Sequence, residues 1–458
     1  MATKIDRRNF MYSTAAIGAG LFVAPSVMGA TESPGKKDDI NVAIIGLGKQ
    51  GTVLYNAITQ LGMKDCGIKF RAFCDIWEDY ILLPQSRRLR SYERWGHKGT
   101  PYTDYKEMLA TEKDLDAVIV ATPDFWHSEH TVACLEAGLH VYCEKEMSNT
   151  LEGAKKMVEA AKTSGKLLQI GHQRRSNPKY RFVNDNIINK SFGGKKLLGR
   201  ITTINGQWNR SRAACVDFGL PKKATKIPVA VLNKYGFKDM KQFMNWRWYK
   251  GLGGGPIVDL GSHQIDIYSW FLGNAKPKSV MASGGVDYWT DHEWYDNVMA
   301  IFEFDTPEGV VRASYQTLTT SGSGSYYEKF MGDRGTLEIS EDPRYFKAGR
   351  DKGVHDKDWQ PWVDAGSITK IPKPKEDPVG GIVDVRSSPP LVPYKLNAVM
   401  KDPYHQPHLV NFFDSIRGKA TLNCPAEMGY ETAVMVLKVN DAVAAEKKLT
   451  FSPEEFEV

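Results

Sequence analysis

Asp259 and His263 stand four residues apart behind three consecutive glycines, in the segment GGGPIVDLGSHQID. Apolar residues continue at helical spacing, which predicts a helix from about Pro256 to Leu272 with both side chains on one face. This pair could chelate a metal, could be a core histidine whose tautomer the aspartate fixes, or could be a general acid/base. No further ligand accompanies them at a convincing spacing, so we expect no metal. We favour an acid/base role, in which Asp259 orients or charges His263 and the histidine needs no unusual pKa at neutral pH.

Lys145 is a second candidate for proton chemistry. It lies in YCEKE, at the end of one apolar strand-like run, and ATPDFWH ends the run before it. Ligands bind at the carboxyl ends of strands in open α/β sheets, so we expect the residues at these ends to face a cofactor. They are Thr122, Pro123, His127, Glu144 and Lys145. A lysine there can hydrogen-bond a substrate hydroxyl beside a nicotinamide, and a solvated surface lysine is the alternative.

A glycine-rich loop, GLGKQG, follows the first strand-like run and precedes a helical pattern. The G-x-G-x-x-G register lets the backbone turn sharply and approach a pyrophosphate, and the helix N-terminus adds free N–H groups. We expect nucleotide contacts from the whole loop, which is Gly46, Leu47, Gly48, Lys49, Gln50 and Gly51. Asp75 ends the second strand-like run. Its carboxylate can accept hydrogen bonds from an adenosine ribose and would repel a 2'-phosphate, which favours NAD over NADP.

The elements around these residues indicate an α/β fold of two domains. Between residues 38 and 168, short apolar runs alternate with helical patterns, which is typical of a doubly wound parallel sheet. Residues 169–405 carry alternating strands such as RITTINGQWN and NVMAIFEFD, and predict an α+β domain with a mainly antiparallel sheet. Residues 341–405 are rich in Pro, Lys, Asp and Gly, and we expect irregular loops there. Residues 406–458 read as helices that pack on the fold.

The N-terminus and the composition bear on location and partners. DRRNFMYS followed by a short apolar run predicts a twin-arginine export signal over residues 1–30, with an N-terminal helix as the alternative. We therefore expect a periplasmic protein without a stable membrane anchor.

A net charge of +6 over 458 residues, with no basic run, argues against a nucleic-acid partner. The six cysteines show no C-x-x-C pairing, and Cys74 and Cys143 lie in strand-like runs where a buried apolar role is common.

The motifs GLGKQG, CD, ATPDFWH, CEKE, GHQRRSNPKY and NWRWYKGLGGGPIVDLGSHQID, in this order, resemble the Gfo/Idh/MocA family of NAD(P)-dependent oxidoreductases. The resemblance implies an N-terminal Rossmann domain and a second domain whose large open sheet often mediates dimers or tetramers, so we expect a homo-oligomer. The E-K-P motif of the family falls on Glu144, Lys145 and Glu146, and its D-x-x-x-H motif falls on Asp259 and His263. Glu146 departs from the family proline and places a carboxylate beside Lys145, which would favour a charged lysine.

The resemblance implies hydride transfer between NAD and a sugar or polyol carbon. His263 would take the hydroxyl proton, Lys145 would position that oxygen, and Asp259 would bind a neighbouring hydroxyl or orient His263. The carbohydrate substrate is expected to contact Gln173, Arg174, Tyr180, Trp246, Arg247, Asp259 and His263. Two alternatives stay open, which are an NAD-dependent glycosidase that oxidises its substrate only transiently and a non-catalytic protein that binds a nucleotide or a sugar.

Overall fold

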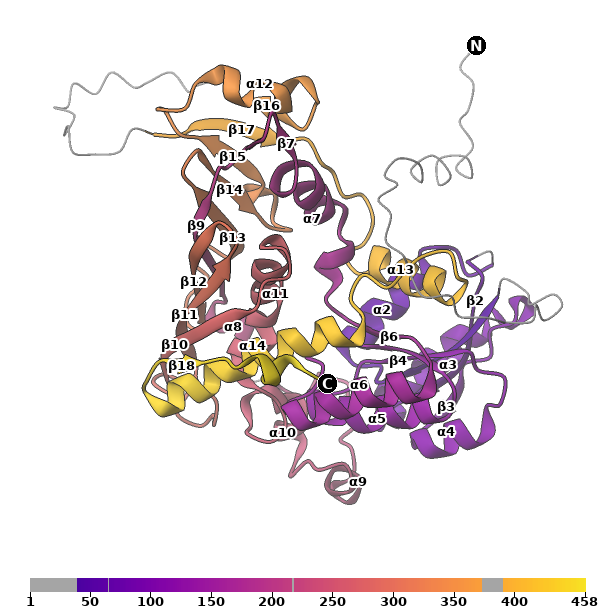
Figure 1. The fold of residues 1–458 in the computed structure, drawn as a ribbon. Coiled ribbons are helices and arrows are strands. Elements are labelled where there is room, and N and C mark those ends of the chain that lie inside the picture. Colours follow the sequence, from indigo (N-terminus) through magenta and orange to yellow (C-terminus); the bar gives the residue numbers. More distant parts are fainter. Residues whose placement is uncertain (1–38, 65, 216–217, 373–389) are drawn as a thin grey trace, which may run out of the picture. The chain divides into compact units, whose positions relative to one another are not determined.

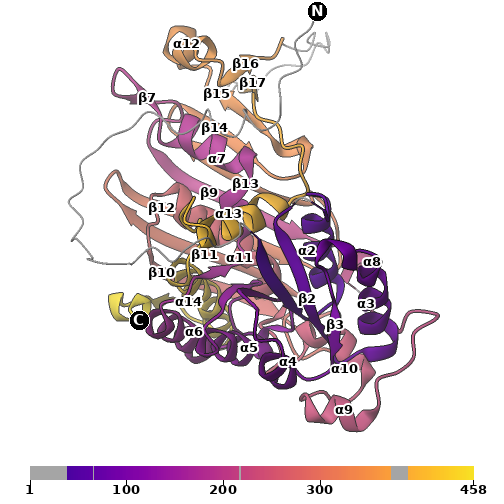
Figure 2. The ribbon, with the colours of Figure 1, turned by 90° about the vertical axis from the view of Figure 1, so that its right-hand side faces the viewer.

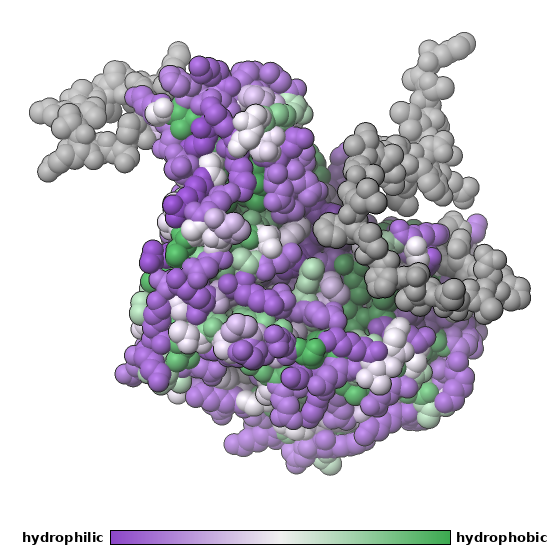
Figure 3. All heavy atoms as spheres, in the orientation of Figure 1, coloured by the Kyte–Doolittle hydropathy of each residue, from purple (hydrophilic) through white to green (hydrophobic). Residues whose placement is uncertain are grey.

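The computed structural model describes residues 39–64, 66–215, 218–372 and 390–458, with the side chains of residues 214 and 215 left out. All of them belong to one compact unit, Asp38–Val458. The predicted export signal lies outside the described residues. The face in Figure 3 is mostly hydrophilic, with apolar residues in small separate patches. In the described part of the chain, no helix is long and apolar enough to cross a bilayer.

The N-terminal domain is built on a six-stranded parallel sheet of order β3-β2-β1-β4-β5-β6. Its strands are β1 (Ile40–Ile45), β2 (Ile68–Cys74), β3 (Thr100–Tyr102), β4 (Ala117–Val120), β5 (His140–Cys143) and β6 (Leu168–Ile170). The strand order reverses between β1 and β4, and ligands bind above such a switch point in doubly wound sheets. This confirms the predicted doubly wound domain.

Both faces of this sheet are covered because its strands are apolar on both sides. Along β1, Ala43 and Ile45 enter one core, and Val42 and Ile44 enter the other. Helices cover both cores, and α2 and α3 are seen beside β2 and β3 in Figure 2. The helices are α2 (Lys49–Thr59), α3 (Leu83–Arg90), α4 (Tyr105–Thr111), α5 (Asp124–Glu136) and α6 (Leu151–Ser164). Cys74 and Cys143 are buried free thiols, as expected.

The second domain contains a ten-stranded sheet of order β16-β17-β15-β14-β13-β9-β12-β11-β10-β18. Its strands are β9 (Ile201–Asn209), β10 (Pro277–Gly285), β11 (Asn297–Thr306), β12 (Gly309–Leu318), β13 (Tyr326–Gly332), β14 (Gly335–Ile339), β15 (Lys347–Arg350), β16 (Ile368–Lys370), β17 (Val392–Leu396) and β18 (Leu449–Thr450), and β7 (Ser191–Phe192) pairs with β8 (Lys195–Lys196) elsewhere. The sheet is mainly antiparallel, as predicted, but β9 and β12 pair in parallel. Helix α11 (Gly255–Phe271) packs on β9 and β12 (Figure 1), close to the predicted span.

The expectation of irregular loops over residues 341–405 is wrong for much of that range. It contains β15, β16, β17 and helix α12 (Asp356–Asp364). Trp359 and Trp362 of α12 are buried and anchor this helix in the core. The three strands are only three to five residues long, too short for their alternation to stand out in a segment rich in Pro and Lys.

The two C-terminal helices connect the domains. Helix α13 (Gln406–Ile416) contributes Phe412 and Phe413 to the core between the parallel sheet and α2. Helix α14 (Ala426–Ala445) contacts α6, α11 and β10. The remaining helices are α7 (Pro178–Val183), α8 (Arg212–Cys215), α9 (Val229–Lys234) and α10 (Met240–Met244), with single-turn helices between the larger elements. The C-terminal helices therefore pack on the fold, as the sequence predicted.

Candidate active site

The glycine-rich loop connects β1 to α2 and shapes the entrance to a cavity. Gly46 has a positive φ of 89°, and a Cβ there would lie 2.6 Å from the carbonyl oxygen of Ala121. A Cβ on Gly51 would overlap the carbonyl oxygen of Gly46. At Gly48, by contrast, no heavy atom lies within 4 Å of the Cβ position. Gly46 and Gly51 thus allow the tight turn of the loop. Gly48 leaves open space through which a pyrophosphate can approach the backbone.

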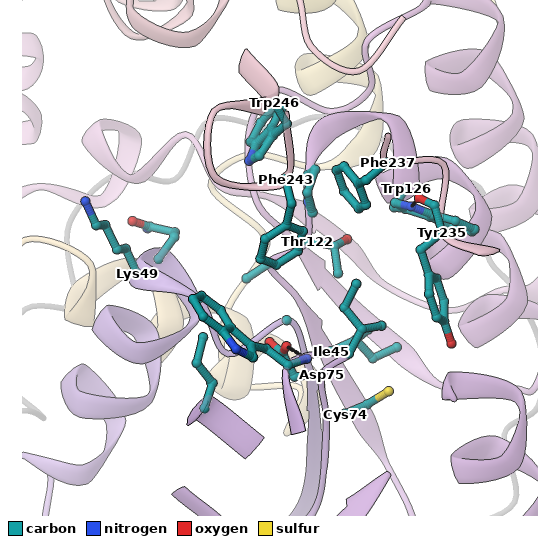
Figure 4. A pocket seen from close by; sticks show the side chains of 18 of the residues that line it. Ile45, Lys49, Cys74, Asp75, Thr122, Trp126, Tyr235, Phe237, Phe243 and Trp246 are labelled. Carbon is teal, nitrogen blue, oxygen red and sulfur yellow. Dashed lines mark hydrogen bonds between the residues drawn. The ribbon is translucent and has the colours of Figure 1, made fainter. Parts of the chain in front are cut away.

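Asp75 is oriented by backbone donors on both sides. Its Oδ2 accepts a hydrogen bond from the N–H of Leu47 at 2.7 Å, and its Oδ1 accepts one from the N–H of Trp77 at 2.8 Å. Each oxygen keeps a further lone pair, and Asp75 lines the cavity (Figure 4). Leu47 itself is buried, so its contribution is this N–H. The carboxylate therefore fits the ribose-binding role that the sequence predicted.

The cavity, here called the nucleotide pocket, runs along the carboxyl ends of β1, β2, β4 and β5. From the predicted cofactor set it is lined by Gly46, Gly48, Lys49, Gln50, Asp75, Thr122, Pro123, Glu144 and Lys145. Gln50 Nε2 donates to Glu144 Oε1 at 3.0 Å, which links the loop to the end of β5. The structure thus brings together most of the residues that the sequence assigned to a cofactor.

His127 does not line this pocket, which corrects the prediction. It is buried, and its ring nitrogens lie 2.7 Å from the carbonyl oxygens of Glu146 and Thr122. One turn later on α5, His130 lines the pocket instead, 3.1 Å from Thr122 Oγ1. Helix α5 begins at Asp124, within the motif ATPDFWH, so His127 lies on its first turn and turns away from the pocket.

A segment of the second domain, residues 218–249, covers the nucleotide pocket, and we call it the covering segment. Trp77 Nε1 donates to the carbonyl oxygen of Thr225 at 2.8 Å, and Trp126 Nε1 donates to that of Tyr235 at 3.1 Å. Tyr235 also donates from its hydroxyl to the carbonyl oxygen of Thr103 at 2.9 Å. In Figure 4, Phe237, Phe243 and Trp246 of this segment lie across the pocket from Ile45, Cys74 and Asp75. A nucleotide in the pocket would be enclosed by aromatic side chains from both domains.

Lys145 and Asp259 meet where the two domains face each other. Lys145 Nζ lies 3.0 Å from Asp259 Oδ1 and also donates to the Asp259 carbonyl oxygen, and Arg247 Nε lies 3.2 Å from the same Oδ1. Burial raises the pKa of Asp259, but the charges of Lys145, Arg247 and Arg210 outweigh it and hold that pKa well below its usual range. Asp259 is therefore a carboxylate that holds Lys145 in place.

His263 follows on the next turn of α11 and is buried. Burial, with the charges of Lys145, Arg174 and His172, lowers its pKa well below the usual value. Within the described residues its Nδ1 has no hydrogen-bond partner, so the prediction that Asp259 orients it is wrong. The expectation of an ordinary pKa is also wrong. The structure instead presents a neutral imidazole one helical turn from a lysine–carboxylate pair.

Two sequence models of one family match the two halves of this arrangement. Residues 40–172 match "Oxidoreductase family, NAD-binding Rossmann fold", and residues 228–338 match "GFO/IDH/MocA C-terminal domain". Together these ranges make up just over half of the chain. The chain belongs to the Gfo/Idh/MocA oxidoreductase family. Its N-terminal domain is the NAD-binding Rossmann domain of that family.

Two similar proteins are named as dehydrogenases of an inositol and of a glucoside. The chain is 28% identical over 251 residues to "scyllo-inositol 2-dehydrogenase (NADP(+)) IolW" of Bacillus subtilis (strain 168), covering 54% of this chain and 55% of that protein. It is 29% identical over 243 residues to "D-glucoside 3-dehydrogenase" of Escherichia coli (strain K12), covering 53% and 57%. The chain thus spans a little over half the length of these relatives. A solved levoglucosan dehydrogenase in complex with NADH shares the fold, with a TM-score of 0.63, 16% identity and coverage of 90% and 99%.

Three residues expected to bind substrate do not line the nucleotide pocket, although Arg174 lies over the Trp208 ring at 5.6 Å. Arg174 is buried and pairs with Glu328 and with Glu341, the latter at 3.2 Å. The Tyr180 hydroxyl donates a hydrogen bond to Glu328 at 2.9 Å. Gln173, which precedes Arg174 in the sequence, is also buried. Of the other residues expected to bind substrate, Trp246 and Arg247 line the nucleotide pocket, and Asp259 and His263 do not. Arg174 and Tyr180 therefore hold the second domain together, because Glu328 on β13 takes up their donors.

Glu146, which replaces the family proline, follows Lys145 directly and is buried. Its Oε1 accepts a hydrogen bond from the N–H of Met147 at 2.7 Å, and its Oε2 has no partner within the described residues. Burial raises the pKa of Glu146 to about 8. The peptide bond between Lys145 and Glu146 is cis. The carboxylate bonded to Lys145 is Asp259, whereas Glu146, expected to favour a charged lysine, makes no hydrogen bond to it.

The sequence missed the aromatic part of the site. Trp77, Tyr235, Phe237 and Phe243 line the nucleotide pocket but fall outside every predicted motif, and Trp126 lies within ATPDFWH but was not assigned to the site. The signal that could have found them is the density of aromatic residues in DIWEDY and in the range 235–248, which includes NWRW. Aromatic residues at such spacing are more often ordinary core, and only the fold shows that these face a cavity.

Proposed function

We propose that this protein is an NAD-dependent oxidoreductase that oxidises or reduces a secondary hydroxyl carbon of a sugar, polyol or glycoside. One observation carries the proposal. Lys145, at the edge of the Rossmann sheet, is bonded to Asp259 at 3.0 Å, and His263 stands on the next turn of the same helix. A proton donor, a proton acceptor and a nucleotide loop are thereby gathered at one place. The names of the relatives support ring alcohols as the substrate class.

The chain's own residues would handle the proton. NAD, when bound, accepts the hydride from the carbinol carbon, and the hydroxyl proton leaves the oxygen in the same conversion of alcohol to ketone. His263 is neutral at neutral pH because its pKa is lowered, so it can accept that proton. Lys145 would donate a hydrogen bond to the reacting oxygen and stabilise negative charge on it. Asp259 would keep Lys145 in place and could accept from a neighbouring hydroxyl.

An aromatic platform lies on the substrate side of this centre. Trp208 stacks on Tyr326 with ring centroids 4.6 Å apart, and the Trp208 ring lies 5.4 Å from that of His263. Flat rings suit the C–H faces of sugars, as they suit other apolar surfaces. We therefore place a sugar ring between Trp208 and Lys145, with its reacting hydroxyl at His263.

The test is a screen of free sugars, polyols and glycosides for reduction of NAD, followed at the nicotinamide absorbance. His263→Ala and Lys145→Ala are each expected to lower turnover by about 10²- to 10⁴-fold without loss of bound nucleotide. Lys352→Ala, at an exposed lysine, is the matched control. If both site variants keep wild-type turnover, the proposed mechanism is wrong. Glycoside cleavage without net NADH would instead support the redox-assisted glycosidase.

We also propose that the protein is exported to the periplasm by the twin-arginine route, on the strength of the N-terminal RRNF motif. Fusion of residues 1–30 to a reporter, with Arg7→Lys and Arg8→Lys together, tests this by loss of export.

We further propose a homo-oligomer that forms through the open face of the ten-stranded sheet. Met281, Met299 and Ile301 point outward from β10 and β11 and are 49%, 56% and 43% exposed. Ile301→Lys is expected to shift the mass measured by light scattering towards the monomer, and an unchanged mass would contradict this interface.

A further inference from the structure

Three cations from separate elements surround the centre described above. Lys49 begins α2, Arg210 follows β9, and Arg247 lies in the short helix Trp246–Trp248. Arg247 pairs with Asp259 at 3.2 Å. Within the described residues, neither Lys49 nor Arg210 has a carboxylate partner, and each lies over an aromatic ring. Lys49 Nζ is 3.5 Å from the Phe218 centroid, and the Arg210 guanidinium is 5.4 Å from that of Trp208.

These cations act on the same groups. Burial and the charges of Arg247 and Arg210 lower the pKa of Lys49. Both arginines also lower the pKa of Asp259. With Lys145, three cations therefore act on the ionised carboxylate of Asp259, and Lys49 lies close to two of them. Of the other acidic groups nearby, Glu144 lines the same pocket and interacts with Arg247, whereas Asp124 has a pKa raised by burial to about 7 and supplies little negative charge. The cations at this place thus outnumber the carboxylates.

Lys49 lies on the nucleotide side of the site, and Arg210 lies on the substrate side. Lys49 directly follows Gly48, so it lies beside the expected pyrophosphate. Arg210 lies over Trp208, whose ring neighbours His263, and so belongs to the substrate side. Arg247 lines the nucleotide pocket and reaches Asp259, between the two. A nucleotide can therefore neutralise Lys49, and Arg210 still lacks an anion.

We propose that the substrate is an anionic carbohydrate of the uronic-acid class and that Arg210, supported by Arg247, binds its carboxylate. The planar guanidinium matches a carboxylate with two parallel hydrogen bonds. Stacking of Arg210 above Trp208 holds the guanidinium at the edge of the aromatic platform on which the sugar ring rests. This inference rests on the proposed function for the position of the ring, but concerns binding and not hydride transfer.

Isothermal titration of the NAD-loaded protein with D-glucuronate, D-galacturonate and the matched neutral hexoses tests the proposal without turnover. At least one uronate should bind about tenfold or more tightly than its hexose at low salt, with a smaller difference at high salt. Arg210→Gln should abolish the preference while bound NAD and melting temperature stay unchanged. Arg312→Gln removes an exposed arginine of the same sheet that pairs with Glu303, and should keep the preference.

Equal binding of uronates and hexoses by the wild type would overturn the proposal, as would a preference that survives in Arg210→Gln. Loss of bound NAD in Arg210→Gln would also overturn it, because the arginine would then serve the nucleotide phosphates. If uronates bind through Arg210 but no sugar reduces NAD, the proposed oxidoreductase activity fails and this assignment stands.

Discussion

Gly48→Ala separates nucleotide binding from folding at the glycine-rich loop. Gly48 has a negative φ of −56°, outside the left-handed region that disfavours a side chain, and its new methyl group would meet no heavy atom within 4 Å. We expect the unfolding free energy to stay within about 1 kcal/mol of wild type, with a slight gain from the stiffer unfolded chain. The methyl group would occupy the space through which the backbone approaches a pyrophosphate. A displacement that costs about 1.5 to 3 kcal/mol corresponds to roughly 10- to 100-fold weaker NAD binding.

Gly51→Ala is the matched comparison, three residues along the same loop. Its Cβ would overlap the carbonyl oxygen of Gly46, which is backbone and cannot rotate away. We expect a loss of about 2 to 3 kcal/mol of stability, as for overpacked cores. Urea denaturation gives the stability, and the nucleotide released from heat-denatured protein gives occupancy. If Gly48→Ala retains full occupancy, or is destabilised as strongly as Gly51→Ala, the assignment of this loop is refuted.

Three further predictions concern groups that the structure placed unexpectedly. Glu146 has a folded pKa of about 8 against 4.5 unfolded, so the native state holds its proton more tightly and stability falls as pH rises from about 4.5 to 8. Urea denaturation of Glu146→Gln should show a gain over wild type that grows to at most about 4 kcal/mol by pH 8, and a constant difference would contradict this. Arg174→Met removes the charged partner of the buried Glu328, so calorimetry should show a markedly lower melting temperature. A variant that changed only KM would show instead that Arg174 belongs to the substrate site. Trp77→Phe removes one hydrogen bond to Thr225 and should speed loss of bound NAD in dialysis about fivefold, whereas an unchanged rate would mean that this bond does not restrain the nucleotide.

The nucleotide half of the site could be predicted because its signals are local. GLGKQG directly follows β1, Asp75 directly follows β2, and Lys145 lies at the end of β5, so strand positions alone bring them together. The helical spacing of the apolar residues around His263 also predicted helix α11 to within one residue at each end. In each case a short stretch of sequence determines both the backbone and the direction in which the side chain points.

The rest could not be predicted because competition between distant partners decides it. Asp259 can reach His263 by helical spacing, but Lys145 lies 3.0 Å away and carries a charge that a buried, neutral histidine lacks. Arg174 stands in a motif that looked like a sugar site, yet Glu328, from a strand far along the chain, takes its guanidinium. The sequence shows which residues can form charged pairs, and only the packing shows which pairs form.

A covering segment that stays closed would make bound NAD a resident group. Hydrogen bonds from Trp77, Trp126 and Tyr235 close residues 218–249 over the pocket, and several must break together before the adenosine end is free. A resident nicotinamide must be returned to its starting oxidation state where it lies. Each catalytic cycle would then need a second half-reaction at Lys145 and His263, either with another carbonyl compound or with the oxidised sugar itself. An exported protein of this kind would carry its redox equivalent with it and would be independent of any nucleotide pool outside the cytoplasm.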